Sequence, residues 1–101
     1  MTLPVPGGVV VNWTLITNHG LILLYISRNS RCTKLEIASA LGITERTVHR
    51  IIKDLEKAGF LSWETTGKGN IYSINAKSKM VHDLTKTVPI KNLLQTLNSL
   101  S

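Results

Sequence analysis

Residues 33–52 constrain the fold of this chain more than any other stretch, because they contain the start signals of two helices and, between them, a glycine that ends the first. Thr33 and Glu36 have the spacing of a capping box, in which each side chain bonds a free backbone N–H at the start of a helix. Gly42 suits the left-handed backbone that ends many helices, because it has no Cβ to strain. Thr44 then suits the N-cap of a second helix. We therefore expect two short helices joined by a tight turn.

Both helices show apolar residues at helical spacing, and the second also has a basic side. The first carries Leu35, Ile37, Ala38 and Leu41. The apolar stripe of the second is made of Val48, Ile51, Ile52 and Leu55. Its opposite side, the basic face, is made of Arg46, His49, Arg50 and Lys53, with Asp54 and Glu56 expected away from it. A helix of this kind, braced by a shorter one, is the helix-turn-helix arrangement that presents side chains to the major groove of DNA.

Residues 60–75 are typical of a β-hairpin, because two runs of strand-forming residues flank a Gly-containing turn. The residues expected to face the core are Leu61, Tyr72 and Ile74. Lys68 lies between two glycines at the tip, and we favour a tip that reaches the minor groove or the flanking phosphates. The alternative is a plain hairpin turn whose lysine serves solubility.

Two further helices are expected on either side of this unit. A helix that begins at about Thr14 or Thr17 and ends at Ser27 is predicted to be buried on most sides, because this stretch has almost no polar side. Residues 28–32 indicate a polar connection. Pro89 suits the start of a final amphipathic helix. This helix either folds back on its own subunit or pairs with a second copy. We expect it to form a dimer through Ile90, Leu93, Leu94 and Leu97, with Leu100 on the same face.

Residues 36–61, EIASALGITERTVHRIIKDLEKAGFL, resemble the winged helix-turn-helix of bacterial and archaeal transcription regulators of the MarR/ArsR-like group. The chain is most similar to small single-domain regulators whose first helix begins with Thr-Asn-His, here Thr17, Asn18 and His19. The resemblance implies a mainly α fold with a β-hairpin: a three-helix core, a two-stranded wing and an extra C-terminal helix. We divide the chain into an N-terminal arm (1–12), a DNA-binding domain (13–76) and a C-terminal segment with the dimerisation helix (77–101).

The basic face and this resemblance predict sequence-specific binding of double-stranded DNA by a homodimeric transcription regulator, which we expect to be a repressor. The residues expected to read base edges are Glu45, Arg46, Thr47 and His49. The residues expected to contact phosphates are Lys34, Arg50, Lys53 and Lys68, with Thr44 serving both its cap and a phosphate. Two alternatives stay open: a winged helix that binds another protein, and an architectural DNA-binding protein without sequence preference.

The charge balance favours a polyanionic partner, because 12 Lys and Arg residues against 6 Asp and Glu residues give a net charge of +6. The single cysteine, Cys32, excludes an internal disulfide and a four-ligand zinc site. One interpretation of Cys32 is a small, partly buried residue. The other is a redox-sensing thiol with a pKa lowered by Arg31 and Lys34. The sequence shows no Gly-rich phosphate loop and no evident pair of catalytic carboxylates, and its histidines and cysteine show no ligand spacing. We therefore expect no enzyme, no cofactor and no metal site. We also expect a cytoplasmic protein without a membrane partner; the sequence indicates no particular effector.

Overall fold

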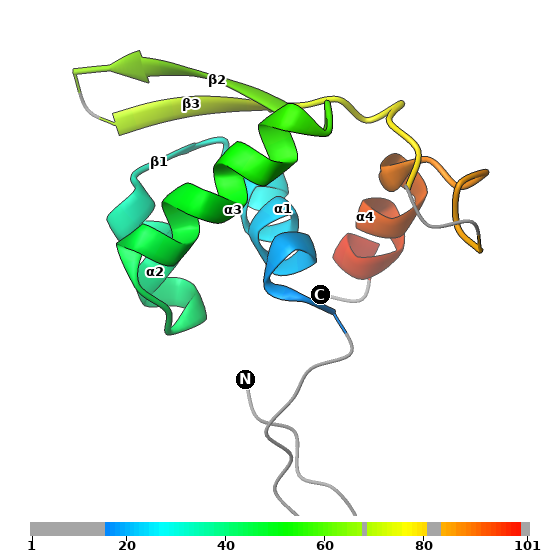
Figure 1. Ribbon diagram of the computed structural model, residues 1–101, viewed down its shortest axis with the longest axis horizontal. Helices are drawn as coiled ribbons and strands as arrows, with labels where there is room; N and C mark the ends of the chain where they lie inside the picture. The colour runs from blue at the N-terminus through cyan, green and yellow to red at the C-terminus, as the bar shows by residue number, and fades with distance from the viewer. Residues whose placement is uncertain (1–15, 68, 81–83, 100–101) are drawn as a thin grey trace, which may run out of the picture.

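The predicted helix-turn-helix lies beside a small sheet and two further helices in the computed structural model, which describes residues 16–67, 69–80 and 84–99. The elements in chain order are α1 (Asn18–Arg28), β1 (Arg31–Cys32), α2 (Lys34–Leu41), α3 (Glu45–Lys57), β2 (Leu61–Thr66), β3 (Gly69–Ile74) and α4 (Ile90–Ser99). Figure 1 shows α1 between the α2–α3 pair and α4, with the β2–β3 hairpin above the helices. This is the mainly α fold with a β-hairpin that the sequence predicts.

Side-chain caps set the starts of α2 and α3. The Thr33 hydroxyl accepts a hydrogen bond from the backbone N–H of Glu36 at 3.1 Å, and the Glu36 carboxylate accepts one from the backbone N–H of Thr33 at 3.4 Å. This reciprocal pair confirms the predicted capping box. Gly42 ends α2 with a φ of 71°, and the Thr44 hydroxyl accepts from the backbone N–H of Thr47 at 3.1 Å. Local sequence therefore determines the turn between the two helices.

The sheet of the described residues has three strands in the order β1-β3-β2, with both pairs antiparallel, rather than the two strands predicted. The missed strand is β1, where the sequence indicated a polar connection. Two residues are too few to show the alternation that reveals a strand. Cys32 pairs with Asn70 and is buried, whereas Arg31 pairs with Ile71 and is exposed. The third strand therefore brings Cys32 into the core.

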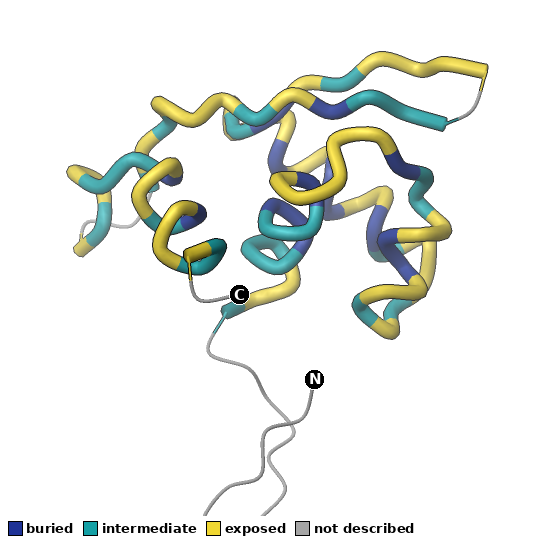
Figure 2. The backbone as a smooth tube through the Cα atoms, turned by 180° about the vertical axis from the view of Figure 1, so that it is seen from behind, coloured by how far each residue is buried: buried dark blue, intermediate teal, exposed yellow. Residues whose placement is uncertain are grey.

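The core lies where α1, α2 and α3 meet the inner face of the hairpin, and Figure 2 shows the buried residues on the sides of these elements that face one another. Its most enclosed side chains are Ile22, Ile26, Ile37, Val48, Ile51 and Ile52. The stripe predicted for α3 is confirmed, since all four of its residues are buried. Leu35, expected on the apolar side of α2, is instead 58% exposed. Positions two apart on a helix lie about 200° apart, and Ile37 takes the inner side.

The hairpin directs one of its faces to this core. The side chains that share this face in the register of β2 and β3 are Leu61, Trp63, Tyr72 and Ile74. Leu61 and Tyr72 are buried, and Ile74 is half-buried and packs against the core. The expected core-facing residues of the hairpin are therefore confirmed.

α4 packs against α1 through Ile90 and Leu94, both buried within the subunit. Arg28 at the end of α1 donates from Nε to Asn98 Oδ1 at 2.6 Å. The helix begins one residue after Pro89, because Pro89 pairs with Lys79 in an isolated bridge. Within the single chain, α4 therefore folds back on its own subunit, as one of the two alternatives predicted.

Three predicted features lie outside the described residues: the N-terminal arm at residues 1–12, Lys68 at the hairpin tip and Leu100. The strand ends beside the tip are described, and the Thr66 hydroxyl donates to the carbonyl of Gly69 at 2.9 Å. Gly69 has a φ of 125°, a conformation that favours glycine. Within the described ranges, no helix has the length and apolar character needed to cross a membrane.

Candidate nucleic-acid interface

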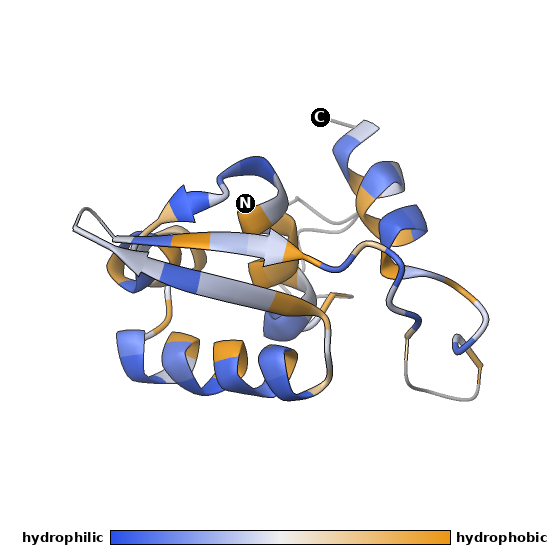
Figure 3. Cartoon of the chain, turned by 90° about the horizontal axis from the view of Figure 1, so that it is seen from above, coloured by the Kyte–Doolittle hydropathy of each residue, from blue (hydrophilic) through white to orange (hydrophobic). Residues whose placement is uncertain are grey.

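The basic face of α3 lies on the surface of the molecule. All four of its residues are exposed, and so is Glu45 beside them. Seen from above in Figure 3, α3 turns hydrophobic residues toward the rest of the protein and hydrophilic residues outward. A surface hollow of about 560 Å³, which we call the basic hollow, is lined by Arg46, Thr47, His49, Arg50, Lys53, Asp54 and Lys57. Arginine and lysine side chains outnumber the carboxylate in this lining, so the hollow suits a polyanion.

Lys34 at the start of α2 connects the basic face to the hairpin. Its Nζ donates to His49 Nδ1 at 2.8 Å and lies 5.4 Å from the centroid of the Trp63 ring. A cation at this distance from an aromatic ring is attracted by the negative ring face. The Lys34 charge also lowers the pKa of His49, with desolvation and Lys53 as smaller causes. The ammonium of Lys34 is therefore held against α3 and the hairpin, beside the surface where a phosphate contact was predicted.

Thr44 and Thr47 lie in the first turn of α3. Their hydroxyl oxygens are 2.9 Å apart, and Thr44 also accepts from the backbone N–H of Thr47. The start of a helix favours an anion, because backbone N–H groups point out of it and its dipole is positive there. The cap predicted for Thr44 is confirmed, and its phosphate contact stays a prediction.

Asp54 lines the basic hollow, so its expected position away from the contact surface is wrong. It follows Arg50 by four residues, and positions four apart share one side of a helix. Asp54 Oδ2 accepts from His19 Nε2 on α1 at 3.0 Å and lies 3.7 Å from Arg50 Nη1. The hydrogen bond from His19, with the charges of His19, Arg50 and Lys57, lowers the pKa of Asp54 against the effect of desolvation. The basic hollow therefore contains a carboxylate that is paired with His19 and Arg50.

Cys32 does not have the surroundings of a redox-sensing thiol. It is buried on β1, and desolvation together with the nearby Glu36 carboxylate raises the pKa of the thiol to about 11. The alternative of a redox-sensing thiol with a lowered pKa is therefore wrong, since desolvation and Glu36 both raise the pKa of Cys32. In the part of the chain that the structure describes, no group of three or more His, Cys, Asp and Glu residues could hold a metal ion.

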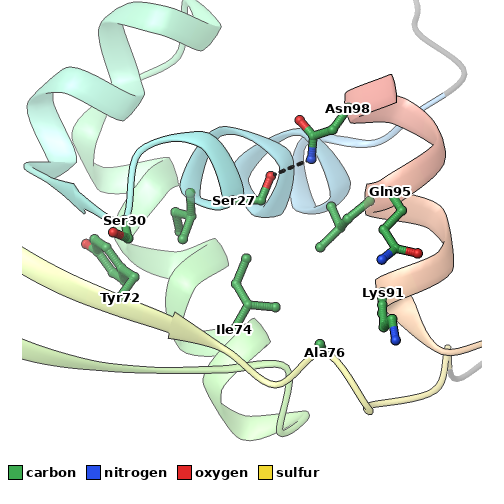
Figure 4. A pocket seen from close by; sticks show the side chains of 10 residues that line it. Ser27, Ser30, Tyr72, Ile74, Ala76, Lys91, Gln95 and Asn98 are labelled. Atoms are coloured by element: carbon green, nitrogen blue, oxygen red, sulfur yellow. Dashed lines mark hydrogen bonds between the residues drawn. The ribbon is translucent and has the colours of Figure 1, made fainter. Parts of the chain in front are cut away.

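The residues predicted for dimerisation differ in how far the subunit covers them. Ile90 and Leu94 are buried against α1, whereas Leu93 and Leu97 are half-buried. Leu94 also lines a second hollow, of about 310 Å³, between α1, β3 and α4 (Figure 4). Asn98 on α4 donates to the Ser27 hydroxyl of α1 at 3.1 Å beside it. Sequence reasoning missed this hollow, because its residues come from three separated elements that share no motif.

Residues 17–62 match the family model described as "Winged helix-turn-helix DNA-binding". The match agrees with the winged helix-turn-helix fold that the structure shows. The matched segment contains α1, β1 and both helices of the helix-turn-helix, and it reaches the first residues of the wing strand β2. The match therefore covers the basic face of α3 with the elements that support it.

The chain is also similar to one curated protein of a different description. A riboflavin kinase from Thermoplasma acidophilum is 35% identical to this chain over 71 residues, which cover 65% of the chain and 32% of the kinase. The chain thus spans about a third of the length of this curated relative. No solved structure matches the chain.

Proposed function

We propose that this chain is a sequence-specific transcription regulator of the MarR/ArsR-like kind, which binds promoter DNA as a homodimer and represses by occupying it. The observation that carries the proposal is the exposed basic face of α3 within a winged helix-turn-helix domain. The buried stripe on the opposite side of α3 holds this face rigid. A rigid, cationic helix surface is what insertion into a major groove requires.

In this proposal, the start of α3 reads the bases. Arg46 can form a two-pronged contact with guanine, and Glu45 can accept from cytosine N4. With Nδ1 accepting from Lys34, a neutral His49 ring carries its proton on Nε2, which is then the donor available to a base edge. Thr47 contributes less, since its hydroxyl already bonds Thr44.

The remaining cations supply the affinity. Each Lys or Arg that neutralises a phosphate releases condensed counterions, so binding falls steeply as salt rises. Arg50 and Lys53 lie on α3 within the basic hollow, and Lys34 lies beside it. Lys68 at the tip of the wing is proposed to reach the flanking phosphates or the minor groove.

Selection of bound duplexes from a random pool, followed by fluorescence anisotropy across a salt series, tests this proposal. We expect a consensus sequence and an affinity that falls linearly in a plot of log K against log salt. Binding without a consensus identifies an architectural protein instead. A chain that binds no duplex at low salt, but captures a folded protein partner, identifies an interaction module.

The homodimer is the part of the proposal that rests on α4. Leu93 and Leu97 are half-buried on α4, so both side chains keep area that a second copy can cover. Two recognition helices one helical turn apart, about 34–36 Å, would then fit a near-palindromic site. Sedimentation equilibrium is expected to show a dimer, and a strict monomer at ~50 µM would contradict it.

We also propose that the chain acts by binding rather than by catalysis. Its similarity to the riboflavin kinase covers only 32% of that protein, whereas a DNA-binding family model matches residues 17–62. Incubation of the purified chain with riboflavin and a nucleoside triphosphate is expected to leave riboflavin unphosphorylated. Formation of a phosphorylated flavin that scales with protein concentration would overturn this part of the proposal.

A further inference from the structure

The basic hollow contains a feature that attraction to phosphate does not explain. Among the described residues, Asp54 is the only carboxylate in its lining, where the neighbouring cations are Arg50, Lys53 and Lys57. A negative charge at this place repels the phosphates that its neighbours attract. Attraction to phosphate alone therefore does not account for a carboxylate at this place.

Two contacts of different length hold the carboxylate. The Arg50 side chain is 64% exposed and its Nη1 lies 3.7 Å from Asp54 Oδ2, whereas the His19 side chain is 42% exposed and its Nε2 lies closer. Water and a phosphate can therefore compete for Arg50 more readily than for His19. His19 belongs to a different helix, and its bond to Asp54 Oδ2 at 3.0 Å ties the carboxylate to α1. Arg50 can therefore leave Asp54 when DNA approaches, whereas Asp54 stays beside the path of the phosphate.

We propose that Asp54 is a specificity-determining residue that weakens binding to duplexes whose bases α3 does not read. The inference rests on the proposed function as a sequence-specific regulator. Binding to an unrelated duplex depends almost wholly on phosphate charge, so one fixed repulsive charge weakens it directly. In this proposal, base contacts on the recognised duplex fix the position of α3 so that Arg50 meets its phosphate on the side away from Asp54. The carboxylate thus raises the ratio of the two affinities, as repulsive elements do in specific interfaces.

Two variants that change the net charge equally test this inference. Asp54→Asn removes the charge inside the hollow and keeps an oxygen that can accept from His19, whereas Glu56→Gln removes an exposed charge on α3 outside the hollow lining. Each variant is titrated by fluorescence anisotropy with the selected duplex and with a scrambled duplex of equal length, over a salt series. Thermal unfolding of each variant checks that it is folded, and Asp54→Ser replaces Asp54→Asn if the latter is not.

We expect Asp54→Asn to bind the scrambled duplex about fivefold more tightly, the effect of one unit charge at contact distance in water. Its affinity for the selected duplex should change by less than about twofold, and its salt slope on the scrambled duplex should steepen by about 0.9, one phosphate contact. Glu56→Gln should affect both duplexes alike and more weakly. The double variant Asp54→Asn/Arg50→Gln should lose the tighter binding of the scrambled duplex that Asp54→Asn alone shows.

Two outcomes overturn the inference while leaving the proposed function intact. The first is an equal gain from Glu56→Gln, which would show an effect of net charge alone. The second is an equal gain of Asp54→Asn on both duplexes, which would leave the ratio of affinities unchanged. A wild-type chain that binds no duplex at all instead overturns the proposed function and this inference with it.

Discussion

Lys34 Nζ and His49 Nδ1 lie 2.8 Å apart, so the two helices of the helix-turn-helix share a hydrogen bond at the surface proposed to meet DNA. The same ammonium lies 5.4 Å from the centroid of the Trp63 ring on β2. One lysine therefore joins α2, α3 and the wing. Since an ammonium can only donate, this link requires a neutral His49, and protonation of the ring breaks it.

The stability of the fold should consequently depend on the protonation of His49. The pKa of His49 is lowered in the folded protein below its ordinary value of 6.5, chiefly by Lys34. The unfolded chain therefore binds the proton first, and stability falls as pH drops through about 6.5 toward the lower folded pKa. Replacing Lys34 by Met removes the main cause of the lowered pKa. We expect Lys34→Met to lose less stability between pH 7.5 and pH 5.5 than the wild type.

Urea unfolding midpoints at the two pH values measure this difference. Lys77→Met is the matched control, because Lys77 is exposed and lies outside the helix-turn-helix. The substitution therefore removes the same charge without touching His49. Its pH dependence should equal that of the wild type. If Lys34→Met and Lys77→Met respond to pH identically, the Lys34–His49 contact does not exist in solution.

The part of the fold that the sequence predicted correctly depends on local rules. The Thr33 and Thr44 caps, the left-handed Gly42 and the apolar stripe of α3 each involve residues within one or two helical turns. Their spacing in the chain is therefore enough to predict them. Leu35 is the instructive exception, because an apolar residue at nearly the right spacing can still lie on the outer side of a helix.

The missed features depend on contacts between distant residues. His19 and Asp54 are 35 positions apart, and Lys34 and His49 are 15 apart, so no periodicity reveals either pair. The burial of Cys32 depends on the pairing of β1 with β3, which only the folded sheet shows. The candidate interface was thus predictable as a helix face, but the positions of its charges were not.

Arg46 is expected to carry sequence preference. It is exposed at the start of α3, where a side chain that enters the major groove meets base edges. Arg46→Ala should cost about 1–3 kcal/mol at one base pair of the selected site and relax the preference there. Competition by duplexes with single substitutions measures this, and a loss spread evenly over all positions would assign Arg46 to a phosphate.

Lys53 is expected to contribute to the affinity for DNA but not to the preference for a particular sequence. It lies two turns further along α3, within the basic hollow. Lys53→Ala should weaken binding to all duplexes by a similar factor and reduce the slope of log K against log salt by about 1. Anisotropy over a salt series checks the slope, and an unchanged slope would remove Lys53 from the interface.

Cys32 is expected to be chemically inert in the folded protein. Its pKa of about 11 leaves about one thiolate in a thousand at pH 8, and its side chain is buried. Iodoacetamide should therefore modify the native chain far more slowly than the chain in urea. Intact mass gives an unambiguous readout, because the chain has one cysteine. Equal rates in the two states would show that the β1 edge opens freely.

The packing of α4 within a single chain leads to the last prediction. Leu94 is 7% exposed, so Leu94→Ala should lower the free energy of unfolding by about 2–5 kcal/mol, near the lower end because the adjoining hollow already reduces its contacts. Leu97→Ala, at a half-buried position on the same helix, should cost less. Urea unfolding at two protein concentrations measures both. The loss from Leu94→Ala should be the same at each concentration, because its partners belong to the same subunit. A Leu94→Ala variant as stable as the wild type would mean that α4 leaves α1 in solution and offers its apolar face to another chain.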